Sequence, residues 1–311
     1  MPTDHSGNAA HIVVVGASNI DLICKISNTY LPRTSNQGTM IYRAGGVARN
    51  VAHTLAVLGV PVLLVSAVGA DNAAETLINI TARAGVDLSH LVRTQLPTGQ
   101  YIAILSREGD LILGLSSMDC LREITPENLS RVWTTISDSA FLVMDCNLSD
   151  HSFTWLAQKA SLNGTRLVVE CVSVEKCRKV NLLLSTKVPI FLLSANLDEI
   201  GALTETAKPR NNSEWIKSAA NRLHEQGVKN LMIGLGQHGC FVSDGQQSRI
   251  VAPFTKTVLN VNGAGDSALA ATLWALSEDH DLFAAARVGQ RPLRSPCPQT
   301  KAPSPNLALQ I

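Results

Sequence analysis

Short β-branched runs alternate with amphipathic helical patterns along most of this chain, and this alternation limits the folds that it can adopt. Strands that alternate with helices pair in parallel, because the chain must cross back over the sheet before it adds the next strand. The sequence therefore predicts an α/β fold with a doubly wound, mostly parallel sheet. The expected strands are residues 11–15, 62–68, 141–144, 166–170, 190–193 and 231–233.

Capping residues mark several helix boundaries between these strands. Asp71 is placed to cap the helix that follows residues 62–68, and Thr125 to cap a helix that starts at Pro126. Residues 47–58 carry apolar side chains on a helical period, as do residues 213–226, where Gly227 provides a stop. These signals predict helices on the faces of the sheet.

Two stretches break the alternation. Residues 21–42 and 99–115 each look like an extended pair joined by a polar turn, at residues 34–38 and 107–110. We expect them to form a small antiparallel β flap, made from about residues 21–44 and 98–117, beside the main sheet. Such a flap could cover a binding site and exclude water from it.

Composition narrows the class of protein further. A chain of 311 residues can bury one large core, and 45% apolar with only 16% charged residues suits a parallel sheet covered by helices. A net charge of +1 argues against nucleic acid and membrane partners, and the longest apolar run is too short to span a bilayer. Seven cysteines without a C-x-x-C pair, and an N-terminus without a signal-peptide core, favour a cytoplasmic enzyme.

The C-terminal end has a different composition. From Arg291 onward, five of the thirteen prolines fall within 21 residues that show no helical or strand period. We therefore expect one domain over residues 10–290, flap included, followed by an irregular, proline-rich tail over residues 291–311.

The strongest chemical signal is a glycine-rich turn before an alanine-rich helix at residues 268–276. Its residues are Asn262-Gly263-Ala264-Gly265-Asp266-Ser267. Small side chains let backbone N–H groups approach a phosphate at the positive end of a helix, and a carboxylate there could accept a proton from an attacking hydroxyl. An ordinary glycine turn with an aspartate at the helix start is the competing interpretation.

Two further stretches could bind a polar ligand. Gly45 and Gly46 open a helix that carries Asn50 one turn later, and this pair permits close contact between ligand and backbone. Asn19 and Asp21 follow the first strand, and α/β proteins bind ligands beyond the carboxyl ends of their strands. Helix capping and turn formation are the competing interpretations.

One motif suggests a cofactor that the context excludes. Gly234-Leu235-Gly236-Gln237-His238-Gly239 spells G-x-G-x-x-G after a strand, but the chain continues into a second strand where the dinucleotide fingerprint requires a helix. The sequence also lacks a Walker motif, a G-x-S-x-G elbow and histidines at metal-ligand spacing. Contact between this loop and a nucleotide is an alternative that the sequence leaves open.

Together these motifs resemble those of the ribokinase-like carbohydrate kinases, the phosphofructokinase-B (PfkB) family, over about residues 11–290. The first family signature is matched by Gly45, Gly46, Asn50 and Ala52, and the second by Asn260-Val261-Asn262-Gly263-Ala264-Gly265-Asp266. The N-x-x-E motif is matched by Asn196-Leu197-Asp198-Glu199, and the glycine loop at 234–239 is similar to the family's T-L-G-x-x-G. Within the family, Glu170-Cys171-Val172-Ser173-Val174-Glu175-Lys176 is most similar to the D-P-V-S-x-x-K segment of pseudouridine kinases.

The resemblance implies an ATP- and Mg²⁺-dependent kinase for pseudouridine. Asp266 would be the catalytic base for the 5′-hydroxyl, and the backbone of Gly263, Ala264 and Gly265 would stabilise the transferring phosphoryl group. The resemblance also implies residues that bind the sugar (Asn19, Asp21, Gly45, Gly46 and Asn50) and residues that bind the nucleotide (Asn196, Gly234, Gly236 and Gly239). It implies that Glu199 lies near the metal. The resemblance also suggests a homodimer through the flap, although an exposed hairpin could equally stay single.

Three departures from the family pattern leave alternatives open. Asn260, Val261 and Gly234 replace family residues, and these changes bear on nucleotide and monovalent-cation contacts. The tail replaces the helix and loop that complete the family's adenine pocket, which suggests an alternative or frame-shifted C-terminus. A kinase for ribose or another nucleoside or sugar, and a truncated isoform without turnover, therefore stand beside pseudouridine kinase.

Overall fold

The computed structural model describes residues 11–206, 213–254 and 263–291. The opening of the second signature, residues 260–262, and the tail from residue 292 onward lie outside the described residues. The expectations for Asn260, Val261, Asn262 and the tail fall on these residues.

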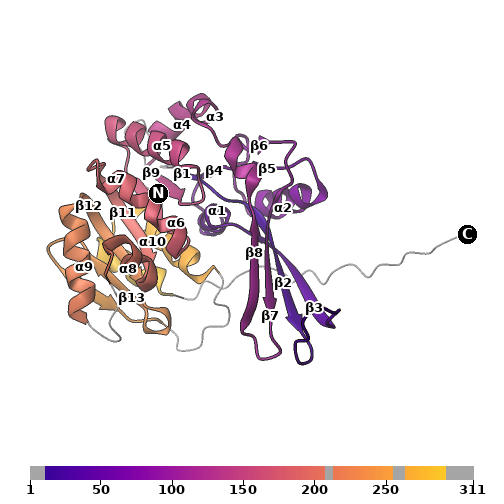
Figure 1. The fold of residues 1–311 in the computed structure, drawn as a ribbon. Helices are drawn as coiled ribbons and strands as arrows, with labels where there is room; N and C mark the ends of the chain where they lie inside the picture. The colour runs from indigo at the N-terminus through magenta and orange to yellow at the C-terminus, as the bar shows by residue number, and fades with distance from the viewer. Residues whose placement is uncertain (1–10, 207–212, 255–262, 292–311) are drawn as a thin grey trace, which may run out of the picture.

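An eight-stranded sheet forms the centre of the molecule, with strand order β14-β13-β12-β11-β10-β9-β1-β4 (Figure 1). The pairings from β4 through β12 are parallel, and β13 and β14 add in antiparallel fashion at one edge. This sheet confirms the predicted α/β class. The strands are β1 (Ile12–Val15), β4 (Val62–Val65), β9 (Phe141–Asp145), β10 (Leu167–Glu170), β11 (Ile190–Asn196), β12 (Val228–Gly234), β13 (Cys240–Ser243) and β14 (Ser248–Val251).

Helices cover both faces of this sheet, each over its own apolar core. One core joins the sheet to α1 (Val47–Val57), α10 (Ala264–Ser277) and α11 (Leu282–Gly289). The other joins it to α3 (Pro126–Arg131), α5 (Asp150–Asn163), α7 (Asn181–Leu184), α8 (Leu197–Thr204) and α9 (Ser213–Glu225). The sheet is therefore doubly wound, as predicted. The remaining helices are α2 (Asn72–Arg83), α4 (Trp133–Ser137) and α6 (Val174–Cys177), with short 3-10 turns at η1 (Asp119–Glu123), η2 (Arg178–Val180) and η3 (Gly236–His238).

The predicted caps are present, and several element boundaries differ from expectation. The Asp71 side chain accepts the N–H of Ala74 at the start of α2, and that of Thr125 caps α3. The strand expected over 62–68 leaves the main sheet after Val65, where the Ser66 hydroxyl donates to the Gly16 carbonyl. Residues 67–68 (β5, Ala67–Val68) pair instead with β6 (Val92–Arg93). The helix expected from residue 268 already begins at Ala264.

A four-stranded sheet with order β3-β2-β7-β8 projects from the main body (Figure 1). Its strands are β2 (Asn19–Ile26), β3 (Gly38–Gly45), β7 (Gly99–Leu105) and β8 (Leu111–Ser117). We call this sheet the flap. The two expected hairpins, β2–β3 and β7–β8, are antiparallel, and they join through a parallel pairing of β2 with β7. The register places Asn19 opposite both Gly45 and Gly99 where the flap meets the body.

None of the helices in the described parts of the chain combines the length and apolar character needed to cross a membrane.

Candidate active site

Asp266 lies in the first turn of α10 with its carboxylate inside the protein. Only 8% of the residue is exposed, and Asn50 Nδ2 donates a hydrogen bond of 2.8 Å to Asp266 Oδ2. Burial raises the pKa of this carboxyl to about 6; the Asn50 hydrogen bond opposes the rise, and the nearby charges of Asp145 and Asp21 add to it. A carboxylate with a pKa near 6 is ionised at neutral pH and still basic enough to take a proton in a transition state.

The N-terminus of α10 offers backbone donors beside this carboxylate. Gly263 adopts a left-handed conformation with φ of 79° and provides no side-chain cap. A Cβ added to Gly265 would meet nothing within 4 Å, and Ala264 and Gly265 are both exposed. The first N–H groups of a helix have no partner within it, so this end can bind an anion. The structure thus brings the four residues predicted from this motif together.

The glycine pair before α1 allows three segments to meet. Gly46 has φ of 95°, and a Cβ there would lie 2.4 Å from the Ala17 carbonyl oxygen. A Cβ on Gly45 would lie 2.3 Å from Asp21 Oδ2. A side chain at Gly46 would therefore push the start of α1 away from the backbone after β1, and one at Gly45 would displace the Asp21 carboxylate.

Asn19 and Asp21 lie on the same face of the flap strand β2, as residues two apart in a strand do. Asn19 Nδ2 donates to Asp21 Oδ1 at 2.6 Å. Burial raises the pKa of Asp21, while the Asn19 hydrogen bond and the charges of Arg49 and Arg43 oppose the rise. Since Asp21 also raises the pKa of Asp266, the flap and α10 contribute carboxylates to one neighbourhood.

Asp145 is a buried carboxylate that holds the backbone around this site, and the motifs of the sequence did not predict it. It ends β9, is 1% exposed, and its Oδ2 accepts the N–H groups of Ala17 at 2.9 Å and Ala48 at 3.0 Å. Its Oδ1 accepts the Asn147 N–H at 2.9 Å. The carboxylate therefore ties together the ends of β1 and β9 and the start of α1. A carboxylate directly after the apolar run Phe141-Leu142-Val143-Met144 was the available signal.

Glu170 occupies the equivalent place at the end of β10. Burial raises its pKa well above the usual range, and the charges of Asp266, Glu199 and Asp145 raise it further. Its Oε2 accepts the Val172 N–H at 2.8 Å. The segment after β10 contacts the loop after β9, where Lys176 Nζ donates to Asn147 Oδ1 at 2.6 Å. Asp145 and Glu170, at the carboxyl ends of β9 and β10, thus bring two further acidic side chains near Asp266.

Asn196 and Glu199 form a capping box at the start of α8. Asn196 Oδ1 accepts the Glu199 N–H at 3.0 Å, and Glu199 Oε2 accepts the Asn196 N–H at 2.8 Å. Burial raises the pKa of Glu199, which is 3% exposed. In the described segments no group of three or more His, Cys, Asp or Glu side chains could hold a metal ion directly. Glu199 could contribute one oxygen to a metal whose other ligands are phosphate oxygens and water.

The glycine loop at 234–239 is not a dinucleotide fingerprint. After β12 it makes the short turn η3 and returns as β13, antiparallel to β12, so the helix that the fingerprint requires is replaced by a strand. Gly239 is structural, because a Cβ there would lie 2.0 Å from the Val251 carbonyl oxygen. Gly236, with φ of 60°, has open space around its Cβ position, and Gly234 has only the Ala195 carbonyl at 3.8 Å. These two glycines leave surface that a nucleotide could contact.

The sequence model of the pfkB family of carbohydrate kinases matches residues 9–291. The chain belongs to this family. Kinases of this family are ATP-dependent phosphotransferases that act on sugar or nucleoside hydroxyls, and the chain is an enzyme of that class.

Individual relatives agree with this family. The chain is 31% identical to a pseudouridine kinase of Escherichia coli, over 85% of this chain and 83% of the relative. It is also 31% identical to an uncharacterized sugar kinase, YeiI, of the same organism, over 89% and 75% of the two chains. Among solved structures, a carbohydrate kinase from Agrobacterium tumefaciens superposes with a TM-score of 0.75 at 28% identity, over 90% of this chain and 88% of that one.

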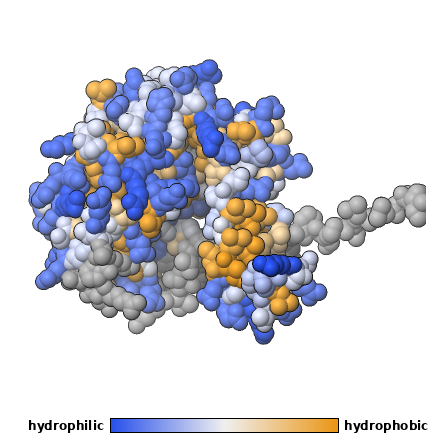
Figure 2. Space-filling view, in the orientation of Figure 1, coloured by the Kyte–Doolittle hydropathy of each residue, from blue (hydrophilic) through white to orange (hydrophobic). Residues whose placement is uncertain are grey.

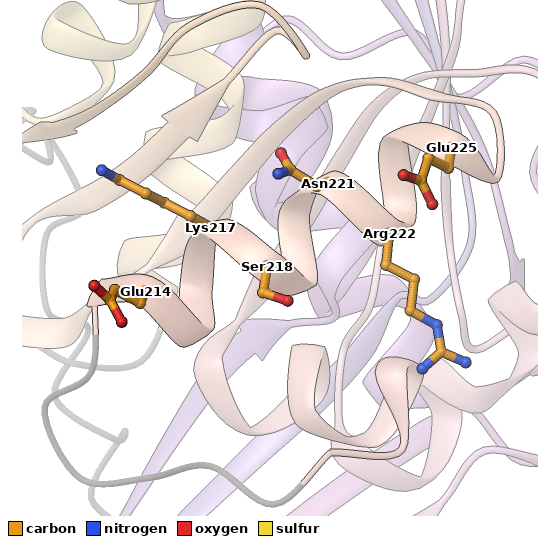
Figure 3. Close-up of a pocket in the computed structure, with 6 residues that line it drawn as sticks. All are labelled: Glu214, Lys217, Ser218, Asn221, Arg222 and Glu225. Atoms are coloured by element: carbon orange, nitrogen blue, oxygen red, sulfur yellow. The ribbon is translucent and has the colours of Figure 1, made fainter.

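A surface depression on this kinase lies apart from these residues. It is lined by side chains of the single helix α9, namely Glu214, Lys217, Ser218, Asn221, Arg222 and Glu225 (Figure 3). The charges are mixed, and none of the residues expected at the active site takes part. A site for phosphoryl transfer needs a base and donors that converge from several elements. Asp266, Asn50 and the N-terminus of α10 meet this requirement, and the single helix α9 does not.

Proposed function

We propose that this pfkB kinase transfers the γ-phosphoryl group of ATP to the 5′-hydroxyl of pseudouridine, giving pseudouridine 5′-phosphate. The observation that carries the proposal is the buried carboxylate of Asp266, held by Asn50 beside the uncapped N-terminus of α10. The similarity to a pseudouridine kinase supports the choice of a nucleoside. The segment from Glu170 to Lys176 supports it as well, because it is similar to the D-P-V-S-x-x-K segment of pseudouridine kinases.

In this proposal each part of the site has one task. Asn19, Asp21, Asn50 and the backbone of Gly45 and Gly46 orient the ribose hydroxyls. Asp266 accepts the proton of the 5′-hydroxyl as that oxygen forms its bond to phosphorus. The N–H groups from Gly263 to Gly265 stabilise the negative charge on the transferring group.

ATP, when bound, supplies the transferable phosphoryl group, and the open surface at Gly234 and Gly236 would face its nucleotide side. Mg²⁺ would neutralise phosphate charge, with Glu199 acting on its water shell and Asn196 holding Glu199 in place. Omitting Mg²⁺ from the assay tests the metal. Assays with and without K⁺ test the monovalent cation that the family resemblance implies.

A panel of acceptors tests the substrate. With ATP and Mg²⁺, we expect kcat/KM for pseudouridine to exceed that for uridine, adenosine and ribose by at least about tenfold, a difference of roughly 1.4 kcal/mol in transition-state binding. ADP release and the mass of the product are the measurements. If ribose or another sugar is the preferred acceptor, the protein is a sugar kinase and the proposal of pseudouridine is wrong. Absence of turnover with every acceptor would favour an isoform that binds ligand without catalysis.

We further propose that the flap mediates a homodimer. Tyr42 and Met40 in β3, and Leu113 and Leu115 in β8, are each at least half exposed and lie on one face of the flap. The opposite face carries Asp21. Figure 2 shows this apolar patch on the flap. A second copy of the flap, self-complementary about a two-fold axis, would remove the patch from water.

Replacing Leu113 and Leu115 together by Glu is expected to convert a dimer of 33.2 kDa chains into a monomer, because two charges would be buried at the interface. Light scattering coupled to size-exclusion chromatography measures the mass. Leu162→Glu is the control, since Leu162 is 86% exposed on α5 and should leave the mass unchanged. A wild-type protein that elutes as a monomer at tens of micromolar would contradict the proposal.

A further inference from the structure

Arg49 is a cation buried between α1, α2 and the flap. Only 6% of the residue is exposed. Its Nε donates to Thr81 Oγ1 at 3.1 Å, and its Nη1 donates to the Ala44 carbonyl at 3.3 Å. The same Nη1 donates to Asn50 Oδ1 at 3.2 Å. One guanidinium therefore links a helix of the body, the last residues of a flap strand and the side chain that contacts Asp266.

This contact determines which way the Asn50 amide faces. An asparagine side chain can present either its oxygen or its NH₂ group to a neighbour. A guanidinium only donates hydrogen bonds, so the atom that faces Arg49 must be Oδ1. The NH₂ group of Asn50 then faces Asp266, to whose Oδ2 it donates at 2.8 Å. With the amide reversed, Asn50 would place its oxygen against a carboxylate and its NH₂ group against a cation.

Arg49 also lies near Asp21, an acidic side chain of the flap. Burial raises the pKa of Asp21, and the positive charge of Arg49 lowers it. Burial, together with the charge of Arg49, lowers the pKa of His53 on the same helix to about 4. His53 is therefore neutral at pH 7, and it does not compete with Arg49 as the cation of this region.

We propose that Arg49 is a positioning residue for phosphoryl transfer: it fixes the Asn50 amide so that the NH₂ group faces Asp266 and the acceptor hydroxyl. The inference rests on the roles proposed above for Asn50 and Asp266. It adds a residue that touches neither the reacting atoms nor the phosphate donor. It also connects the flap to the base, because the guanidinium that orients Asn50 binds the end of β3 as well.

A double-mutant cycle tests this role. Arg49→Met keeps the length of the side chain and removes its donors, and we expect it to lower kcat/KM for the acceptor by about 10–100-fold, the cost of a small misplacement at a reacting centre. In an Asn50→Ala background the same change should cost less than about threefold, because no amide remains to orient. If the two losses simply multiply, Arg49 acts independently of Asn50 and the proposal is wrong.

Three further variants separate positioning from folding. Arg49→Lys keeps the charge but cannot reach three acceptors with a planar fork, so its activity should lie between those of the wild type and Arg49→Met. Thr81→Val removes the Nε acceptor alone and should produce a smaller loss in the same direction. Arg83→Met, at the exposed end of α2, is the matched control and should leave kcat/KM unchanged. Melting temperatures identify any variant that fails to fold; Arg49→Lys and Thr81→Val then carry the test, and activity equal to wild type in both would reject the proposal.

A measurement without turnover distinguishes this inference from the proposed function. The side-chain NH₂ resonances of Asn50 can be assigned by their loss in Asn50→Ala. In the wild type we expect two separated, slowly exchanging signals, and in Arg49→Met faster exchange and a smaller separation. If no acceptor is phosphorylated, the proposed function fails while this spectrum still decides the role of Arg49. Unchanged Asn50 signals in Arg49→Met would show that the guanidinium does not hold the amide.

Discussion

Asp266→Asn is expected to lower kcat by about 10²–10⁴-fold, the usual contribution of a general base. An amide cannot accept the proton that the 5′-hydroxyl releases. It can still accept the hydrogen bond that Asn50 donates, so the geometry of the site should survive the change. Steady-state ADP release with saturating ATP and acceptor measures the loss. Asp138→Asn, an exposed substitution on the body, should retain wild-type activity.

The same substitution should raise stability at neutral pH. The pKa of Asp266 is raised from 3.8 to about 6 in the folded protein, so the folded state binds this proton more tightly than the unfolded state does. The stabilising effect of protonation is complete below pH 4 and is lost as pH rises through 6. At pH 7 the wild type buries a carboxylate and Asp266→Asn a neutral amide, so its melting temperature should be higher. Full phosphorylation activity with a higher melting temperature would remove Asp266 from the role of base.

The pKa also sets the expected pH dependence of catalysis. The base must be ionised, so kcat/KM should fall as pH is lowered through about 6 and level off above pH 7. This fall in kcat/KM at low pH reflects Asp266 together with its charged neighbours, because the charges of Asp145 and Asp21 act on its titration. A profile between pH 5 and pH 8 measures it, and a rate that stays constant down to pH 5 would contradict the assignment.

The second large effect is expected at Asp145, whose loss should destabilise the fold. Asp145→Ala leaves the N–H groups of Ala17, Ala48 and Asn147 without their acceptor in a buried place. Each unsatisfied buried donor costs about 1–3 kcal/mol, and relief of the buried carboxylate offsets part of the sum. We expect a net loss of about 3 kcal/mol in the free energy of unfolding, measured by urea denaturation.

Activity should fall together with stability in Asp145→Ala, because the start of α1 would no longer be fixed against β1. Asp150→Ala is the control: Asp150 is 75% exposed and pairs with Lys179 at 3.4 Å, so its loss should cost about 1 kcal/mol or less. A free energy of unfolding within about 0.5 kcal/mol of wild type for Asp145→Ala would show that water can replace the carboxylate.

Local sequence signals predicted the elements of the fold and part of the site. Alternating strands and helices gave the class of the sheet, and Asp71 and Thr125 gave helix starts, because a cap acts on N–H groups only a few residues away. The motifs also placed Gly263–Asp266 at a helix N-terminus. Even so, the sequence put the start of α10 four residues too late, since glycine and alanine allow both a turn and a helix.

Contacts between distant residues were decided by the tertiary structure alone. No local pattern predicts that β2 pairs in parallel with β7, which turns two hairpins into one flap. The hydrogen bond from Asn50 to Asp266 spans 216 residues, and that from Ala17 to Asp145 spans 128. The sequence by itself therefore determined the motif residues that could carry the chemistry, such as Asp266 and Asn50, but neither Asp145 nor Arg49. Only the packing of the whole chain set their burial and charge environment, which depend on neighbours that no short stretch of sequence contains.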